Sequence, residues 1–563
     1  MIERKEKLMP KNSSSKTGFS RRDFLKGLAS GSGGLIAFAA GIPVAAAPAT
    51  DTSAAPRAQN ADVLLQIAGW PYTVPPVEEP EGGYTAQQQA LLVWMEQNPN
   101  VRMEAVEAPI WATDQLRTLI TGGTAPAFFH PGVLAVWTIE GKHVVFNQGL
   151  LADLTNQFEE FDLESQLSAT VRSASVEYEA GGAKFGLPEA VTPGNGIFFR
   201  RDLFEEAGVE PLTVDSTWEE IREKALALTN EARLGMGTQW WGVEWMLASE
   251  GFNKAGLFNY IPTPNESWNW RFDYTSYPEM VEVVERYRAM IHEDKSLGSN
   301  YGDWDLLGQF FNGTMAIVTV PLQYFTETGD IGPAALAAQV GRPISEVVGA
   351  IPHPRGMNGH YSTEGRPGVS VFSVNPDADE ATKSASASLY QYMFLGEGFE
   401  TQRRVAFEET GNLQRVFSPY PFVRAEQSIE GIDGTPTDAW GQEYIDLVNY
   451  TTATATGYPM RGQFFPPEMD LGPTESAWSD ATSLFRDEPG DLDVLATLQT
   501  AQDVRNQQAE SFTSAIPDDQ FIAAAQAYYD ANAAYWQEKF PDFYENTYRP
   551  WYEAVIVPAL GLE

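Results

Sequence analysis

The chain has 563 residues, of which 43% are hydrophobic and 20% are charged. This composition is too apolar for a disordered chain, and the length is sufficient for two or three compact units. Cysteine is absent, which excludes disulfides, thiolate nucleophiles, iron–sulfur clusters and cysteine-bound zinc. The formal net charge of -39 argues against nucleic acid or an anionic membrane as a partner, because both would repel the protein.

Residues 1–47 have the pattern of an export signal. They hold eight Lys or Arg residues against three acidic residues, and an uncharged stretch rich in Ala and Gly follows the basic part. The segment Ser20–Lys26, which contains Arg21 and Arg22, resembles the twin-arginine signal that directs folded proteins across a membrane. We therefore expect residues 1–47 to be removed and residues 48–60 to form a flexible leader. The mature protein would then work in the periplasm or outside the cell.

The first part of the mature chain alternates between strand patterns and helix patterns. Apolar runs predict strands at residues 63–68, 101–106 and 127–129, and helices at residues 85–97 and 113–120. Such alternation with short loops favours a three-layer α/β unit in which parallel strands are joined by right-handed crossovers. Ligands of such sheets bind beyond the carboxyl ends of the strands, so the loops that follow these strands are candidate ligand contacts.

A second unit is predicted after the first. Residues 196–208 form a strand that carries the chain across and continues directly into a helix, with Gly208 as its C-terminal cap. Ser216 or Thr217 then caps a second amphipathic helix, which has two glutamates in its positive first turn.

Several segments occur in the same order as signature motifs of a known family. They resemble those of extracellular solute-binding proteins of family 1, the sugar-importer group, and together they cover about residues 60–410. The matching segments are residues 115–126, 184–189, 196–208, 217–229, 309–317, 348–354 and 368–374.

The resemblance implies an α/β fold like that of periplasmic binding proteins, with two three-layer lobes that are joined by a hinge and close over a solute. Lobe 1 would contain residues 60–190 and 350–410, and lobe 2 would contain residues 195–345. Residues 411–563 would form a largely helical region that packs on the lobes, and the sequence leaves open whether it also borders the cleft. Its helical patterns cover residues 491–509 and 518–540.

The abundance of aromatic residues suggests how a solute would be bound. The chain has 15 Trp, 22 Tyr and 31 Phe. Aromatic rings stack on the apolar faces of sugars, and carboxylates and amides bind hydroxyl groups, so this combination suits a neutral polyol. The densest cluster contains Trp240, Trp241 and Glu244. A single tryptophan is more often a core residue, but we expect at least one ring of this cluster to face the cleft.

Other candidate contacts come from the resemblance. Asp303, just before Trp304, is either a helix N-cap or a ligand acceptor, and we favour the cap. The implied contacts are Trp70 and Tyr72 after the first strand, Glu189 and Asn195 beside the crossover, Gln323 and Tyr324 in a cleft loop, and Arg366 before the return strand.

Signatures of enzymes are missing from the sequence. The five histidines show no metal-ligand spacing, and no nucleophile elbow, phosphate loop or dinucleotide fingerprint occurs. We therefore expect no catalytic residue, metal or cofactor, and no nucleic-acid partner. The expected function is that of a monomeric binding protein that delivers a sugar or oligosaccharide to the permease subunits of an ABC importer. The alternatives are a secreted glycoside hydrolase, because paired carboxylates occur by chance in so acidic a chain, and a binding protein that serves a sensor.

Overall fold

The computed structural model describes most of the chain from Val63 onward. The described residues are 63–68, 73–106, 108, 113–131, 142, 145–192, 195–250, 252–253, 256–257, 272–322, 324, 332–354, 368–420, 422–454, 472–513, 516–539, 541, 544–545 and 549–562. Within that part of the chain, every helix is too short or too polar to span a lipid bilayer. The predicted export signal and leader, and four predicted ligand contacts, lie outside the described residues. These four contacts are Trp70, Tyr72, Gln323 and Arg366.

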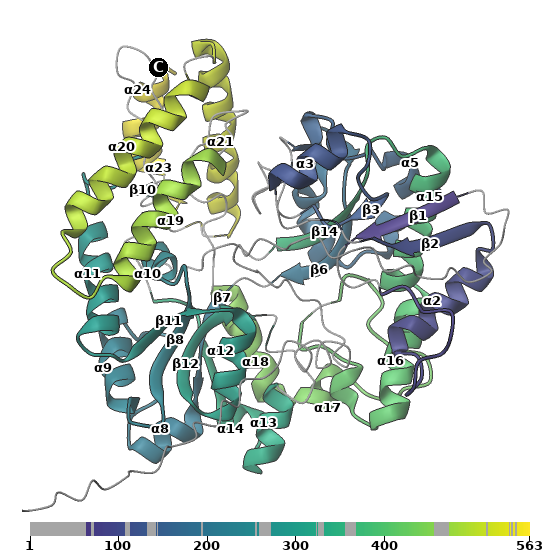
Figure 1. The fold of residues 1–563 in the computed structure, drawn as a ribbon, viewed down its shortest axis with the longest axis horizontal. Coiled ribbons are helices and arrows are strands. Elements are labelled where there is room, and N and C mark those ends of the chain that lie inside the picture. The colour runs from purple at the N-terminus through teal and green to yellow at the C-terminus, as the bar shows by residue number, and fades with distance from the viewer. Residues whose placement is uncertain are drawn as a thin grey trace, which may run out of the picture.

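Two five-stranded sheets form the centres of two lobes, which lie side by side in Figure 1. In lobe 1, β1 runs parallel to β2 and β3, whereas β14 runs antiparallel to both β3 and β6. Buried apolar side chains such as Leu65, Phe128 and Phe372 join this sheet to its helices. The spatial order of its strands is β2 (Val101–Ala105), β1 (Val63–Ala68), β3 (Phe128–Phe129), β14 (Gly368–Val374) and β6 (Leu187–Thr192).

The sheet of lobe 2 has a related arrangement. Here β8 runs parallel to β11 and β12, whereas β7 runs antiparallel to β12 and β13. The spatial order is β11 (Leu297–Tyr301), β8 (Leu234–Gln239), β12 (Met315–Pro321), β7 (Asn195–Arg200) and β13 (Val348–Ile351). Both sheets combine with helices, so the α/β architecture predicted from the sequence is confirmed.

The chain passes between the two sheets at two points that the strands define. It leaves lobe 1 after β6 and enters lobe 2 as β7, and it returns from β13 of lobe 2 to β14 of lobe 1. Directly after β7, α8 (Arg201–Ala207) ends at Gly208, whose φ of 67° lies in the left-handed region. The next helix begins after Thr217, whose side chain accepts a hydrogen bond from the Glu220 N–H. The prediction that Gly208 caps the first of these helices is confirmed, and of the two predicted caps of the second, Ser216 and Thr217, the structure has Thr217.

Helices surround both sheets (Figure 1). In lobe 1 they are α2 (Ala86–Gln97), α3 (Thr113–Thr121), α5 (Thr155–Glu160), α6 (Leu163–Gln166), α7 (Ala169–Ser173), α15 (Glu380–Tyr390) and α16 (Glu397–Thr410). In lobe 2 they are α8, α9 (Trp218–Leu228), α10 (Val243–Ser249), α11 (Pro278–His292), α12 (Asp303–Asn312), α13 (Pro333–Val340) and α14 (Ile344–Val347).

The C-terminal helices extend lobe 2. Trp440 and Tyr444, from α17 (Pro436–Trp440) and α18 (Gln442–Thr454), belong to a buried cluster with β12 and α12. Further along, Trp478, Phe485 and Leu498 share an apolar core with α9 and α11. Figure 1 shows the helices that carry them rising above lobe 2. These helices are α19 (Gly472–Asp487), α20 (Val494–Thr513) and α21 (Asp518–Lys539), and the short α23 (Arg549–Trp551) and α24 (Val557–Leu560) follow.

One helix begins later than the sequence pattern predicts. The pattern placed its start at residue 491, whereas α20 starts at Val494. The side chain of Asp493 accepts a 2.9 Å hydrogen bond from the Ala496 N–H, which satisfies a donor that the first turn leaves unpaired. The capping side chain therefore fixes the boundary.

Candidate functional site

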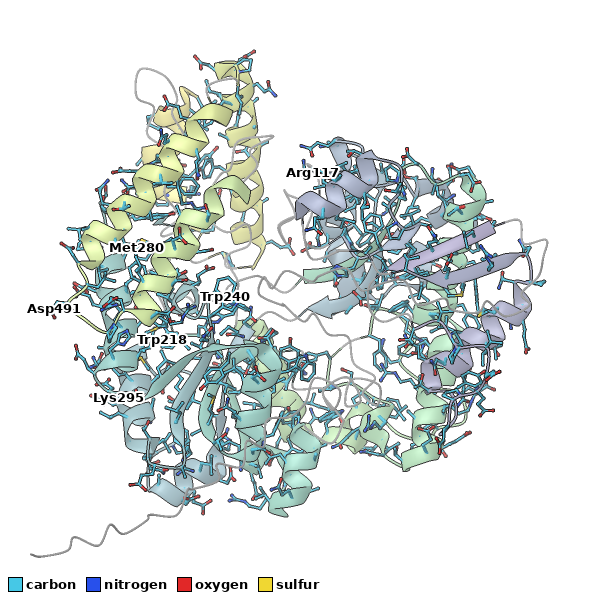
Figure 2. The ribbon with its side chains drawn as sticks, viewed as in Figure 1. Arg117, Trp218, Trp240, Met280, Lys295 and Asp491 are labelled. Carbon is cyan, nitrogen blue, oxygen red and sulfur yellow. The ribbon has the colours of Figure 1, made fainter. Side chains whose placement is uncertain are left out.

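The carboxyl ends of β8 and β12 lie at one edge of the sheet of lobe 2. These strands end at Gln239 and Pro321. Because β7 runs antiparallel to β12, Asn195 at the start of β7 is paired with Pro321 and lies at the same edge. Trp240 follows β8 directly, between the sheet and the C-terminal helices (Figure 2). The fold therefore brings Asn195 and Trp240, two predicted contacts, to one edge of this sheet.

A carboxyl group joins the segments at this edge. Gln239 Nε2 donates a 2.6 Å hydrogen bond to Asp303 Oδ1, and the Tyr324 hydroxyl donates a 3.0 Å bond to Asp303 Oδ2. The other end of the Gln239 amide accepts a 2.9 Å hydrogen bond from Trp245 Nε1. The end of β8, the start of α10, the start of α12 and the segment after β12 are thereby connected through Asp303 and Gln239.

Asp303 does not cap its helix, contrary to the expectation from the sequence. The N-cap residue of α12 is Gly302, and Asp303 is the first residue of the helix. Its carboxyl group points to the side chains of Gln239 and Tyr324 instead of a backbone N–H. Burial raises the pKa of Asp303 above its ordinary value, and the two hydrogen bonds oppose that change. The geometry places a half-buried acceptor at the strand ends.

Aromatic rings lie next to this carboxyl group. Trp304 and Tyr324 have ring centroids 5.6 Å apart, and Tyr324 is buried whereas Trp304 is half-buried. Trp240 and Trp241, also half-buried, meet edge to face with centroids 4.9 Å apart. Within the described part of the chain, the buried Nε1 atom of Trp304 has no hydrogen-bond partner. Half-buried rings keep part of their surface available for stacking.

Glu244 has a different environment from the tryptophans beside it in the sequence. It is 9% exposed, and its Oε1 atom accepts a 2.9 Å hydrogen bond from Trp478 Nε1 of α19. The side chain of Glu244, a predicted ligand contact, therefore binds a C-terminal helix.

Lobe 1 presents a second polar cluster, which contains the predicted contact Glu189. The Ser370 hydroxyl of β14 donates a 2.9 Å hydrogen bond to Glu189 Oε2 of β6. His130 Nε2, just after β3, lies 3.0 Å from the Ser370 hydroxyl and 3.6 Å from Glu189 Oε2. The three side chains come from β3, β14 and β6, which are adjacent in the sheet, or from the residue just after β3. Glu189 lies on β6, the last strand of lobe 1 before the chain enters lobe 2.

Burial dominates the electrostatics of this cluster. It raises the pKa of Glu189 from 4.5 to about 7, and the hydrogen bond from Ser370 opposes the rise. Burial and the positive charge of Lys142 lower the pKa of His130 to about 3. Lys142 in turn binds Glu177, with 2.8 Å between Nζ and Oε2. Burial therefore favours the uncharged forms of both the imidazole and the carboxyl group.

Sequence reasoning identified part of this arrangement. Of its ten candidates, six lie in the described residues, and among them Asn195, Trp240, Trp241 and Tyr324 gather at the strand ends of lobe 2. It did not select Gln239, which ends β8 as a fully buried polar side chain, or Ser370. The one signal present in the sequence is a glutamine at the end of a strand segment, at residues 234–239.

The described residues contain no group of three or more His, Asp or Glu side chains placed to hold a metal ion. The polar groups at the strand ends are instead hydrogen-bond donors and acceptors next to aromatic rings. Such a set can bind hydroxyl groups and the apolar faces between them.

Two α/β lobes with polar and aromatic residues at their strand ends define the fold class of periplasmic binding proteins. The family model of the bacterial extracellular solute-binding proteins matches residues 77–385, which is more than half of the chain. The chain belongs to this family, and the resemblance seen in the sequence is confirmed. No curated protein sequence matches the chain.

Solved structures share the fold at low sequence identity. One is an ABC transporter solute-binding protein from Agrobacterium vitis with bound D-mannitol, with a TM-score of 0.54, 16% identity, and coverage of 80% of this chain and 99% of that chain. Another is the ABC substrate-binding protein Lmo0181 from Listeria monocytogenes in complex with cycloalternan, with a TM-score of 0.53, 15% identity, and coverage of 79% and 98%. Maltose-bound MalE3 from T. maritima gives a TM-score of 0.51, 16% identity, and coverage of 81% and 100%.

Proposed function

We propose that the protein binds an uncharged sugar or polyol between its two lobes and delivers it to the permease of an ABC importer. Membership of the solute-binding family supports this proposal, and so do the D-mannitol, cycloalternan and maltose named for the similar structures. The observation that carries it is the Asp303 carboxyl group, held by Gln239 and Tyr324 next to half-buried tryptophan rings.

The charges near the strand ends favour a neutral solute. Glu189 and Asp303 supply carboxyl oxygens, one in each lobe. Of the described cations, Lys142 already binds Glu177, and Arg486 binds Asp487 with 2.5 Å between Nη2 and Oδ2. An anionic solute would have to compete with Glu177 and Asp487 for these two cations. The hydroxyl groups of a sugar need only hydrogen-bond donors and acceptors.

The proposed activity is binding without catalysis. Glu189 accepts a hydrogen bond from Ser370, and both oxygens of Asp303 accept hydrogen bonds from protein side chains. Carboxyl groups held in this way suit recognition of hydroxyl groups. A glycoside hydrolase would instead need one carboxyl group that protonates a leaving oxygen and another that attacks or activates water.

Calorimetric titration with D-mannitol, ribitol, maltose and a maltose oligomer tests the proposal. We expect at least one of these to bind with a Kd of about 1 μM or tighter. We also expect chromatography of the ligand after prolonged incubation to reveal no cleavage. Absence of binding across a wide panel of neutral sugars and polyols would contradict the proposed solute class, and release of shorter products would favour the hydrolase.

Export is a separate part of the proposal. We propose that residues 1–47 direct the folded chain through the twin-arginine route, because Arg21 and Arg22 stand in a matching motif. Replacing both by lysine should leave the precursor in the cytoplasm, as fractionation would measure, while replacement of Lys16 by arginine should not. Normal export of the double variant would rule out this route.

A further inference from the structure

The C-terminal helix α19 reaches the segment that carries the candidate tryptophans. It lies outside residues 77–385, where the family model matches. Trp478 Nε1 donates a 2.9 Å hydrogen bond to Glu244 Oε1, and Arg486 Nη1 donates a 3.5 Å bond to the Trp240 carbonyl oxygen. Both ends of the short segment from Trp240 to Glu244 are therefore attached to the same helix.

The segment itself is a tight turn. The Gly242 N–H donates to the Gln239 carbonyl at 2.9 Å, and the Glu244 N–H donates to the Trp241 carbonyl at 2.9 Å. Gly242 has no room for a side chain, because a Cβ there would lie 2.2 Å from the Thr238 Cγ2 atom. The turn is thus compact, and α19 contacts it through Trp478 and Arg486.

Helix α19 is itself fixed to lobe 2. The Arg288 guanidinium of α11 donates to the carbonyls of Leu484 and Phe485 at 3.3 and 3.2 Å, and to that of Gly490 at 2.8 Å. Trp478 is 1% exposed and belongs to the apolar core of lobe 2. Because α19 is fixed to the lobe, its hydrogen bonds to the turn restrict the motion of the turn relative to the lobe.

We propose that Trp478 and Arg486 are positioning residues for the solute site, and that the C-terminal extension is a constituent of that site. They hold the turn in which Trp240 and Trp241 stand, so the rings are presented in one orientation before the solute arrives. Preorganised rings bind more tightly because the protein loses less conformational entropy on binding. The inference rests on the proposed function for its effect on affinity, but the effect on the turn is independent of any solute.

The first test is amide hydrogen exchange in the free protein. Trp478→Phe keeps a buried ring and removes the N–H that binds Glu244, and we expect exchange at Gly242 and Glu244 to accelerate about fivefold or more. The matched control is Trp440→Phe, because Trp440 is also buried and its Nε1 donates a 2.8 Å bond to the Phe417 carbonyl. This control should leave the turn within about twofold of the native rate. Equal protection of the turn in both variants would overturn the proposal.

Arg486→Met serves as a second variant, since it removes the bond to the Trp240 carbonyl outside the apolar core. If Trp478→Phe fails to fold, exchange at the turn in Arg486→Met decides the matter in the same way.

The second test measures affinity with D-mannitol and maltose as probes. For a probe that the native protein binds, Trp478→Phe should raise the Kd about tenfold, and Trp440→Phe should leave it within about twofold. Faster exchange at the turn with an unchanged Kd would refute the positioning role. If the native protein binds neither probe, the proposed solutes are wrong, and the exchange experiment still decides whether α19 holds the turn.

Discussion

Gln239 and Asp303 are joined by a 2.6 Å hydrogen bond between the Nε2 atom of one and the Oδ1 atom of the other. The bond connects the end of β8 to the start of α12, and α10, α11 and β11 lie between these two segments in the sequence. Gln239 is fully buried, so its amide cannot exchange partners with bulk water. The orientation of the Asp303 carboxyl group is therefore fixed before any solute binds.

Asp303→Asn should weaken solute binding without destabilising the protein. An amide in place of the carboxyl group offers a donor to Gln239 or Tyr324, which are themselves donors, so we expect the Kd for a bound polyol to rise about tenfold or more. Burial raises the pKa of Asp303, which means that the folded state disfavours its charged form at neutral pH. Asparagine removes that cost but also loses one of the two accepted hydrogen bonds, so the two effects offset each other and the melting temperature should change little.

The control for this variant is Asp305→Asn. Asp305 is exposed in the same first turn of α12, so the substitution should leave the Kd unchanged. Titration calorimetry and scanning calorimetry measure the two quantities. An Asp303→Asn protein with native affinity would remove Asp303 from the solute site.

The sequence predicted the fold much better than the site. Hydrophobic periodicity and caps such as Thr217 act within a few residues, so several strands and helices of both lobes, such as β1 and α9, could be located without coordinates. The role of Asp303 could not, because its partners Gln239 and Tyr324 are distant along the chain and meet it only after folding. A local rule therefore assigned Asp303 to a helix cap.

The C-terminal extension illustrates the same limit. Its helical patterns are clear in the sequence, and two of the three long helices were predicted. Nothing in those patterns indicates that Trp478 contacts Glu244, because the relevant distance arises from packing against α11. Predictions of partners across long separations need the tertiary structure.

Glu189→Gln should change how stability depends on pH. Burial raises the Glu189 pKa from 4.5 to about 7, so the folded protein loses stability as the pH rises through this interval, by about 3 kcal/mol in total. Glutamine cannot ionise and retains an acceptor for Ser370. The melting temperature of the variant minus that of the native protein should therefore be larger at pH 8 than at pH 4.5.

Scanning calorimetry at both pH values checks this expectation, and the exposed Glu159→Gln serves as the control. The lowered pKa of His130 works in the opposite direction as the pH falls, and it acts in both the native protein and the variant. A constant difference in melting temperature between pH 4.5 and pH 8 would show that Glu189 does not ionise within this window.

His353→Phe should protect the protein against acid. His353 is fully buried between the rings of Trp218 and Trp245, and within the described residues neither of its ring nitrogens has a hydrogen-bond partner. Burial lowers its pKa to about 3, so the stability that the neutral ring contributes is lost as the pH falls from its ordinary value of 6.5 toward 3. Phenylalanine keeps the ring contacts and has no proton to gain.

The melting temperature of His353→Phe should therefore fall less than that of the native protein between pH 7 and pH 4.5. The half-buried His292 provides the control substitution, His292→Phe. Parallel decreases in the native protein and in His353→Phe would show that protonation of His353 contributes nothing to acid sensitivity.

Gly235→Ala should destabilise lobe 2 and weaken solute binding together. A Cβ at Gly235 would lie 1.8 Å from the Ala225 carbonyl oxygen of α9, so β8 and α9 would have to separate. We expect a loss of roughly 3 kcal/mol or more, beyond the usual cost of overpacking because the obstacle is backbone. Since β8 ends in Gln239, its displacement should also disturb the Asp303 carboxyl group and raise the Kd.

The matched control is Gly308→Ala in α12. A Cβ at Gly308 has nothing within 4 Å, and alanine favours the helix over glycine by about 1 kcal/mol, so this variant should melt at a higher temperature. Thermal unfolding of the two proteins distinguishes a general sensitivity to alanine from the close contact of β8 with α9. Equal melting temperatures would contradict the packing of these two elements and, with it, the means by which lobe 2 places Gln239 beside Asp303.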